Sequence, residues 1–214
     1  MGKNLVVIFD FDGTIADTMN SIGKIMDKLS GDFDFKKIKD ANLQELKNKK
    51  TKEVFKSLGI SLIKLPRVLG KVRRVLHEEI EEVKPIKGME EVLPRLKKDN
   101  WQMGIITSCP SETVKKFLNK NNLNLFDFIY SEGNIFSKAD KMNALLKERK
   151  LNPENVFYVG DETRDIEAAK SAGIKMIAVT WGFNNEEILK EQKPDYLIRK
   201  PEELISLLNG FLVK

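Results

Sequence analysis

The sequence predicts an α/β protein with a doubly wound parallel sheet and one helical insertion, for three reasons. The apolar run Leu5–Phe9 is rich in β-branched residues, which favours a short strand buried on both faces. From residue 89 onward, short apolar segments alternate with helical stretches, a pattern typical of parallel sheets. Between these regions, residues 15–84 show helical periodicity and no clear strand. We therefore expect a Rossmann-like core of residues 1–14 and 85–214, with an inserted all-helical subdomain of residues 15–84.

The inserted segment divides into several helices. After Thr14, apolar residues recur at helical spacing, namely Ile15, Met19, Ile22, Ile25, Met26 and Leu29. Further helices are expected over residues 42–49, 51–58 and 65–84, and the first helix of the core over residues 89–99. Pro85 and Gly88 mark the end of the insertion, because both residue types interrupt helices.

The remainder of the core is expected to continue as strand and helix in turn. Strands are predicted over residues 102–106, 126–131, 156–159, 175–180 and 195–198. Helices are predicted over residues 111–121, 138–150, 164–172, 186–192 and 201–208. Gly173 follows one of these helices directly, and glycine at that place is a common helix terminator.

Composition narrows the class of protein. Of the 214 residues, 41% are hydrophobic and 32% are charged, which is enough apolar material for a core and typical of a soluble chain. No apolar run approaches the ~20 residues that a membrane-spanning helix needs, and Leu5–Phe9 is too short for a signal peptide. The single cysteine, Cys109, cannot form an internal disulfide, which agrees with a reducing compartment. We expect a cytoplasmic protein without membrane partners.

The net charge of +5 is concentrated in one region. Residues 15–84 hold 16 Lys and Arg against 11 Asp and Glu, an excess equal to the whole net charge. The basic residues alternate with acidic ones and form no aromatic platform, so nucleic acid is not the expected partner. A solvated, Lys-rich surface explains the excess, as does steering of a small anionic substrate.

Polar residues that suit one kind of chemistry follow three of the predicted strands. Asp10 and Asp12 follow the first strand, whereas Thr107 and Ser108 end the second. A later strand ends at Asp161, with Glu162 and Asp165 close behind, and Lys138 begins a helix. The carboxyl ends of parallel strands meet at one edge, so these groups are expected to converge there.

The converging groups favour phosphoryl transfer. The neighbouring carboxylates repel each other unless a cation or a shared proton compensates, and carboxylate oxygens suit a hard cation such as Mg²⁺. Hydroxyl groups and an ammonium group can hold phosphoryl oxygens, and one carboxylate can act as a nucleophile or base. An Asp-rich turn that merely caps the next helix is the simpler explanation of Asp10–Thr14 taken alone.

These motifs resemble those of a known family. Asp10-Phe11-Asp12-Gly13-Thr14, Thr107, Lys138 and residues 160–165 are similar, in this order, to the four motifs of haloacid-dehalogenase-superfamily hydrolases. Within that superfamily the chain resembles the phosphoglycolate-phosphatase-like subfamily over essentially its whole length. The resemblance implies a Mg²⁺-dependent phosphatase for a small phosphorylated metabolite, with the helical insertion as a mobile cap.

The resemblance also implies roles for individual residues. Asp10 would be the nucleophile that becomes an aspartyl-phosphate, and Asp12 would protonate the leaving group and then activate water. Thr107, Ser108 and Lys138 would hold the phosphoryl group. Mg²⁺ would be held by Asp10, Asp12 (through its backbone carbonyl) and Asp161. Behind them, Asp165 would orient Lys138 or metal-bound water, although Glu162 and Asp165 could exchange duties.

Several alternatives stay open. Asp12 weighs against a dehalogenase, because that branch lacks the second Asp. A pyrophosphatase or a sugar phosphomutase would use the same framework, and a non-catalytic phosphate-binding module would keep the pocket without turnover. Lys141 lies one turn after Lys138 and could replace it, but a position at the helix start favours Lys138. The substrate and the oligomeric state cannot be deduced from the sequence.

Four further features have a functional and a structural interpretation. The lone His77 lies among acidic residues and is expected to be a solvated surface residue. Cys109 is expected to be a small buried residue rather than a nucleophile. Trp181 follows a strand end, where packing is its expected role and the rim of a pocket the alternative. The last feature is a group of cations on one predicted helix, which form a solvated face or include one contact to the substrate's non-reacting end: Arg67, Lys71, Arg73 and Arg74.

Overall fold

A single parallel sheet forms the centre of the molecule. In the computed structural model, which describes residues 5–131 and 138–212, six strands lie in the order β3-β2-β1-β4-β5-β6. All five pairings are parallel. The strands are β1 (Val6–Phe9), β2 (Gln102–Thr107), β3 (Phe128–Ser131), β4 (Val156–Gly160), β5 (Lys175–Val179) and β6 (Tyr196–Ile198). This order confirms the predicted doubly wound α/β class, and it places β1 at the centre, where the chain reverses its winding direction.

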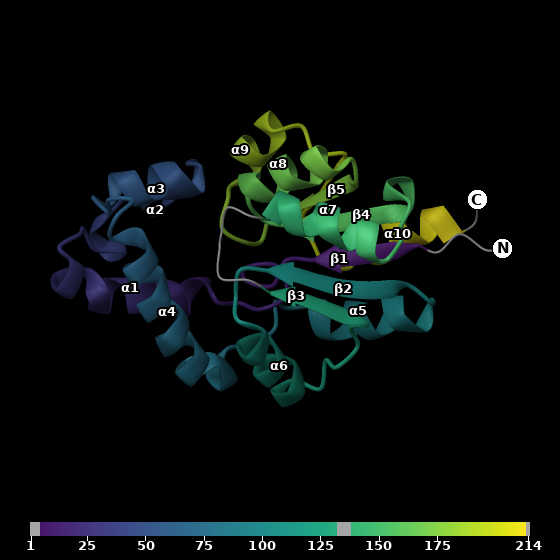
Figure 1. Ribbon diagram of the computed structural model, residues 1–214, viewed down its shortest axis with the longest axis horizontal. Coiled ribbons are helices and arrows are strands. Elements are labelled where there is room, and N and C mark those ends of the chain that lie inside the picture. Colours follow the sequence, from purple (N-terminus) through teal and green to yellow (C-terminus); the bar gives the residue numbers. More distant parts are fainter. Residues whose placement is uncertain (1–4, 132–137, 213–214) are drawn as a thin grey trace.

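Helices cover both faces of the sheet (Figure 1). One face carries α5 (Met89–Lys98), α6 (Ser111–Lys120) and α10 (Glu203–Leu212), which share a buried cluster with Val7 and Phe9. The other face carries α7 (Lys138–Glu148), α8 (Thr163–Ala172) and α9 (Glu186–Glu191), which pack with Val6 and Ile8. Successive side chains of a strand point to opposite faces, so β1 contributes apolar residues to both layers, as its unbroken apolar run predicted.

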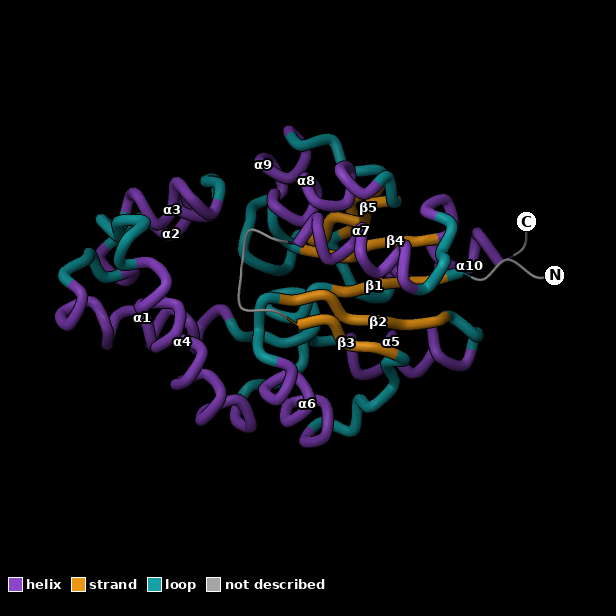
Figure 2. Tube along the Cα trace, in the orientation of Figure 1, coloured by secondary structure: helices purple, strands orange, loops and turns teal. Residues whose placement is uncertain are grey.

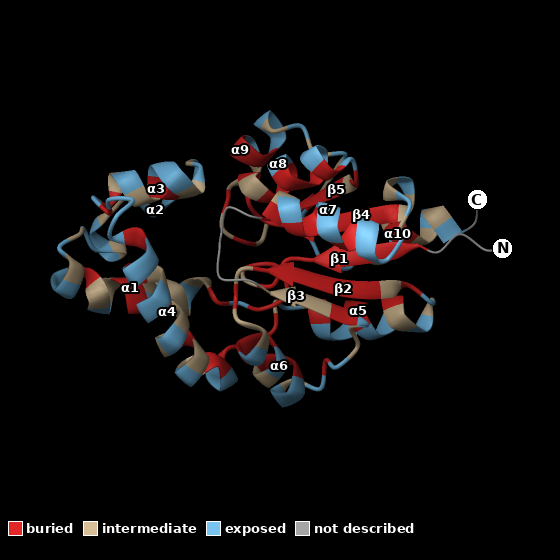
Figure 3. Cartoon of the chain, viewed as in Figure 1, coloured by how far each residue is buried: buried red, intermediate tan, exposed pale blue. Residues whose placement is uncertain are grey.

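The inner strands β1, β2, β4 and β5 are buried, the edge strands β3 and β6 are partly exposed, and the outer helix surfaces are exposed (Figure 3). All four residues of β1 have no exposed surface. In β2, Gly104 faces the Phe128 ring so closely that an added Cβ would lie 2.0 Å from it, so glycine here lets the ring pack across the strand. Helix α8 ends at Ala172 and is followed by Gly173, whose φ of 68° lies in the left-handed region, as expected for the terminator predicted there.

The segment between β1 and α5 contains only helices among its regular elements (Figure 2). We call residues 15–84 the helical segment. It comprises α1 (Met19–Phe33), η1 (Ile38–Asp40), α2 (Leu43–Lys47), α3 (Thr51–Ser57), α4 (Leu65–Glu79) and η2 (Ile80–Glu82). These helices lie beyond the carboxyl ends of the strands, on the side opposite the two chain termini (Figure 1). The polar residues at the strand ends therefore face the helical segment.

Two local expectations were wrong. Ile15 was assigned to a helix, but α1 begins at Met19 and the Ile15 N–H donates to the carbonyl of Phe11, 3.0 Å away. The helix expected over residues 65–84 is split, because α4 ends at Glu79 and η2 follows. Within the described ranges, no helix is long and apolar enough to cross a membrane.

Candidate active site

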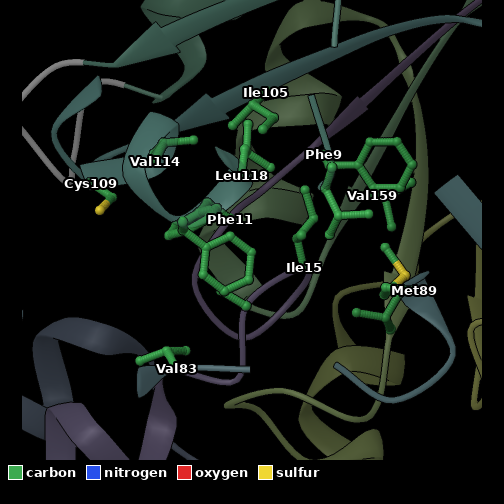
Figure 4. Close-up of a cluster of buried hydrophobic side chains, with 14 of the residues drawn as sticks. Phe9, Phe11, Ile15, Val83, Met89, Ile105, Cys109, Val114, Leu118 and Val159 are labelled. Carbon is green, nitrogen blue, oxygen red and sulfur yellow. The ribbon is translucent and has the colours of Figure 1, made fainter. Parts of the chain in front are cut away.

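A tight turn after β1 positions the first two carboxylates. The Asp10 N–H still pairs with the sheet, donating to the carbonyl of Val159 at 2.8 Å. The chain then turns back at Gly13, which has a φ of +73°, a value that glycine adopts without strain. Phe11 and Ile15 have no exposed surface and anchor this turn in the apolar core (Figure 4). Asp10 is consequently fixed with 1% of its surface exposed.

Lys138 joins a carboxylate at the end of β1 to one in the first turn of α8. It begins α7, is 4% exposed, and its Nζ lies 2.7 Å from Asp10 Oδ2 and in contact with Asp165 Oδ1. Burial works against the charged ammonium, but the attraction of Asp10 and Asp165 raises the pKa of Lys138 above its usual value. The Asp10 carboxylate also accepts a hydrogen bond from the Phe11 N–H at 2.8 Å, so both of its oxygens are oriented.

Asp161 lies beside the turn, in a slot formed by two glycines. Its Oδ1 accepts a hydrogen bond from Thr14 Oγ1 at 2.8 Å, and its Oδ2 accepts one from the Phe183 N–H at 2.7 Å. A Cβ added to Gly13 would lie 2.5 Å from Asp161 Oδ2, and one added to Gly182 would lie 2.2 Å from it. Both glycines are therefore needed for the chain to approach this carboxylate.

The carboxylates form a buried cluster that fits a divalent metal ion. Asp10, Asp161 and Asp165 each place an oxygen within 4.8 Å of the other two. Burial and the neighbouring acidic groups raise the pKa of Asp161 well above its ordinary range. A carboxylate in that position needs either a proton or a cation, and oxygen-only ligands suit a hard divalent cation.

Thr107 and Ser108, at the end of β2, lie at the same edge of the sheet as these carboxylates. Thr107 is 1% exposed, its Oγ1 accepts a hydrogen bond from the Cys109 N–H at 3.0 Å, and Ser108 beside it is half-buried. Lys141, the alternative to Lys138, donates from Nζ to the Thr107 carbonyl at 3.1 Å. Cys109 is 3% exposed, and burial raises the pKa of its thiol, which confirms the expectation of a small buried residue.

Glu162 and Asp165 have different surroundings. Asp165 contacts Lys138 through one oxygen, and its other oxygen accepts a hydrogen bond from the Glu162 N–H at 3.0 Å. Glu162 instead pairs with Arg164 at 2.5 Å and accepts a hydrogen bond from Thr51 Oγ1 at 2.8 Å. Burial opposes ionisation of Glu162, but Arg164 holds its pKa below the usual value. Asp165 thus faces the ammonium group, while Glu162 faces the helical segment.

Comparison with known proteins identifies the family. The family model of haloacid dehalogenase-like hydrolases matches residues 7–179, well over half of the 214-residue chain. The chain belongs to the haloacid dehalogenase-like hydrolases. A phosphoglycolate phosphatase from Synechococcus elongatus is 31% identical to this hydrolase, covering 96% of this chain and 98% of the relative. The pyrophosphatase PpaX from Bacillus mycoides is 26% identical, covering 95% of this chain and 96% of the relative.

Solved structures of other proteins have the same fold as this hydrolase. A predicted phosphatase from Clostridium acetobutylicum has a TM-score of 0.83 at 22% identity, covering 98% of this chain and all of that one. A haloacid dehalogenase-like family hydrolase from Streptococcus pneumoniae has a TM-score of 0.76 at 22% identity, covering 95% and 98% of the two chains. At these identities the comparison supports the same arrangement of sheet and helices.

Three polar residues of this hydrolase form contacts that sequence analysis did not assign. Thr14 holds Asp161, and Thr51 of the helical segment holds Glu162. Asn184, which is 1% exposed, accepts a hydrogen bond from the Thr163 N–H and donates to the carbonyls of Lys47 and Lys49 at 2.9 and 3.1 Å. Asn184 thus joins the helical segment to the loop bearing Asp161. Neither Thr51 nor Asn184 lies in a motif, so only their contacts identify them.

The close approach of Gly182 to Asp161 is testable. Gly182→Ala is expected to destabilise the protein by about 1–3 kcal/mol, because its Cβ would displace either the carboxylate or the loop. The melting temperature should fall by several degrees. Gly210→Ala is the matched control, because nothing lies within 4 Å of a Cβ there, and its melting temperature should be unchanged or slightly higher. A Gly182→Ala protein that melts like the wild type would mean that the loop relaxes without cost.

Proposed function

We propose that this hydrolase is a Mg²⁺-dependent phosphatase that cleaves a small phosphate monoester through an aspartyl-phosphate on Asp10. The observation that carries the proposal is the buried contact of Lys138 with both Asp10 and Asp165, beside Asp161 at the same sheet edge. The relatives named phosphoglycolate phosphatase and pyrophosphatase support phosphate chemistry at this edge. A cytoplasmic location, expected from the composition, is part of the proposal.

Asp10 is the nucleophile in this proposal. Lys138 and the Phe11 N–H hold its two oxygens, at 2.7 and 2.8 Å, and orient the group toward an incoming phosphorus atom. Attack forms an O–P bond to Asp10 and breaks the bond to the leaving oxygen, so the hydrolysis becomes two displacements. Asp165 keeps Lys138 in place through the second contact.

Asp12 serves as the acid and then the base. Burial, followed by the charge of Asp10, raises the pKa of Asp12 to about 6, so the group exchanges its proton close to neutral pH. Its Oδ1 is buried and has no hydrogen-bond partner among the described residues. The carboxyl group can give its proton to the departing oxygen and later take one from the water that attacks the phospho-aspartate.

The remaining residues hold the phosphoryl group and the metal ion. Thr107, Ser108 and Lys138 supply hydroxyl and ammonium donors for phosphoryl oxygens. Asp10, the backbone carbonyl of Asp12 and Asp161 would hold Mg²⁺, with Asp165 close by as a further carboxylate. Bound there, the ion would supply positive charge against the oxygens of the transferring group.

The helical segment acts as the cap. Its contacts to the core include Lys50 with Glu167 at 2.7 Å, Thr51 with Glu162 at 2.8 Å, and Lys47 Nζ with the Gly182 carbonyl at 3.3 Å. These polar contacts hold α2 and α3 next to the loops that carry the catalytic groups. Their opening would admit the substrate, and their closure would exclude water from the phospho-enzyme.

The first test is release of inorganic phosphate from a panel of small phosphates, with and without Mg²⁺. The panel comprises phosphoglycolate, pyrophosphate, a sugar phosphate, a nucleoside monophosphate and a chromogenic aryl phosphate. Metal-dependent release from at least one ester supports the phosphatase, and release from pyrophosphate alone selects a pyrophosphatase. Isomerised sugar phosphate would select a mutase. Folded protein that binds Mg²⁺ but releases no phosphate would overturn the proposal in favour of a binding module.

A further inference from the structure

The carboxyl-terminal end of α4 is attached to the core near Thr107 and Ser108, the residues at the end of β2. His77 Nδ1 and Thr113 Oγ1 share a hydrogen bond at 2.8 Å, and Thr113 lies in the first turn of α6, just after Cys109. Glu81 of η2 pairs with Lys116 of α6 at 3.8 Å. The expectation that His77 is a solvated surface residue was therefore wrong, because α6 covers one side of the ring.

Arg73 faces the same way as His77 and reaches the active site. Residues four apart share one side of a helix, so Arg73 lies one turn before the contact with α6. Its side chain is half-buried, and its Nη2 is buried without a hydrogen-bond partner among the described residues. Burial lowers the pKa of Arg73, and the charge of Arg164 lowers it further. Cys109 and Asp12 act in the opposite direction and raise it. These neighbours all belong to the candidate active site.

An unpaired guanidinium nitrogen in this position is costly. A buried donor without a partner loses the hydrogen bonds that water would give it, and a charged donor loses more. The other three cations of the predicted group avoid this cost, since Arg67, Lys71 and Arg74 are all exposed. The structure therefore singles out one member of that group, and its free donor atom is directed into the protein rather than into solvent.

We propose that Arg73 binds an oxyanion carried by the leaving group of the substrate, and thereby selects substrates with a second negative charge. The inference rests on the proposed function. Attack by Asp10 requires the leaving oxygen to depart on the opposite side of the phosphorus atom. That direction leads from the sheet edge toward the helical segment, which contributes Arg73. The planar guanidinium group matches a carboxylate or a phosphate with two parallel hydrogen bonds.

A pair of nearly isosteric substrates tests this role in the wild-type protein. Phosphoglycolate carries a carboxylate where 2-hydroxyethyl phosphate carries a neutral CH₂OH group, and both leave through a primary alcohol oxygen. The wild-type protein should prefer phosphoglycolate by about 10- to 100-fold in kcat/KM, mainly through KM, because one charge-assisted interaction is lost with the neutral ester. Pyrophosphate serves as a second probe, which distinguishes a phosphate oxyanion from a carboxylate.

Variants locate the effect at Arg73. Arg73→Met should remove the preference for the charged leaving group, raising KM for it by about 10- to 100-fold while changing hydrolysis of 2-hydroxyethyl phosphate about twofold at most. Arg73→Lys should retain part of the preference. Arg74→Met is the matched control, since Arg74 is the exposed neighbour on the same helix, and should behave like the wild type.

The outcomes separate the two proposals. A wild-type protein that hydrolyses no phosphate overturns the proposed function itself. An active wild-type protein without preference for the charged leaving group overturns only the role of Arg73. The role of Arg73 is also overturned if Arg73→Met slows the hydrolysis of both esters equally, because that result would indicate a structural role for the side chain. If Arg73→Met does not fold, Arg73→Lys and the wild-type substrate ratio decide the question.

Discussion

Asp10→Asn is expected to abolish phosphate release, lowering kcat by at least about 10⁴-fold. The amide keeps the shape of the side chain but cannot form the aspartyl-phosphate. Lys138 retains its contact with Asp165, so the buried ammonium keeps one partner and the fold should persist. The measurement is inorganic phosphate release with the best substrate of the panel, together with a melting curve. Intact-mass analysis of briefly reacted wild-type protein should show one added phosphoryl group that the variant lacks.

The matched control for Asp10→Asn is Asp17→Asn. Asp17 is an exposed acidic residue that follows the same turn, and its replacement should leave activity unchanged. If Asp10→Asn keeps more than a few per cent of wild-type turnover while Asp17→Asn is normal, the covalent mechanism on Asp10 is wrong. Direct attack by water would then be the remaining explanation for any metal-dependent hydrolysis.

Lys138→Met is expected to have the largest effect on stability. Lys138 is 4% exposed and compensates two buried carboxylates, so removing it leaves Asp10 and Asp165 without their shared cation. Removing one partner of a buried ion pair lowers the free energy of unfolding by about 3–5 kcal/mol. This is a large part of the ~5–15 kcal/mol by which a typical domain is stable. The melting temperature at pH 8 should fall by roughly 10 °C. Phosphate release should be lost as well.

The destabilisation by Lys138→Met should shrink as pH falls. Burial already raises the pKa of Asp165 to about 6 despite the nearby Lys138, and removing the ammonium raises it further. In the variant, Asp165 has a folded-state pKa above its unfolded value, so protonation favours the folded state. The destabilisation caused by Lys138→Met is therefore present in full above the folded-state pKa of Asp165, and it is relieved as the pH falls through that pKa.

Melting curves at pH 8 and pH 5 test the pH dependence. The exposed Lys147→Met, on the same helix, should melt like the wild type at both values. A Lys138→Met protein that is equally destabilised at both values would contradict the electrostatic explanation and indicate lost packing instead.

Much of the fold was predictable because its signals are local. The Leu5–Phe9 run, the alternation after residue 89 and the terminator Gly173 each depend on neighbouring residues, and the parallel sheet follows from them. The convergence of polar strand ends was predictable for a related reason, since parallel strands end at one edge. Ile15 was misassigned because a residue that anchors a turn in the core has the same apolar character as one on a helix face.

The sequence by itself therefore determined the α/β class, the order of the motifs and the residue types that meet at the sheet edge. It favoured Lys138 over Lys141 only through the place of Lys138 at the helix start, because residues three apart lie on one side of a helix. Only the packing of α7 against the sheet directs Lys138 to the carboxylates and Lys141 to the Thr107 carbonyl. For the same reason, the docking of α4 onto α6 alone distinguishes Arg73 from its exposed neighbours. These distinctions arise from contacts between segments far apart in the chain, and local spacing carries no information about them.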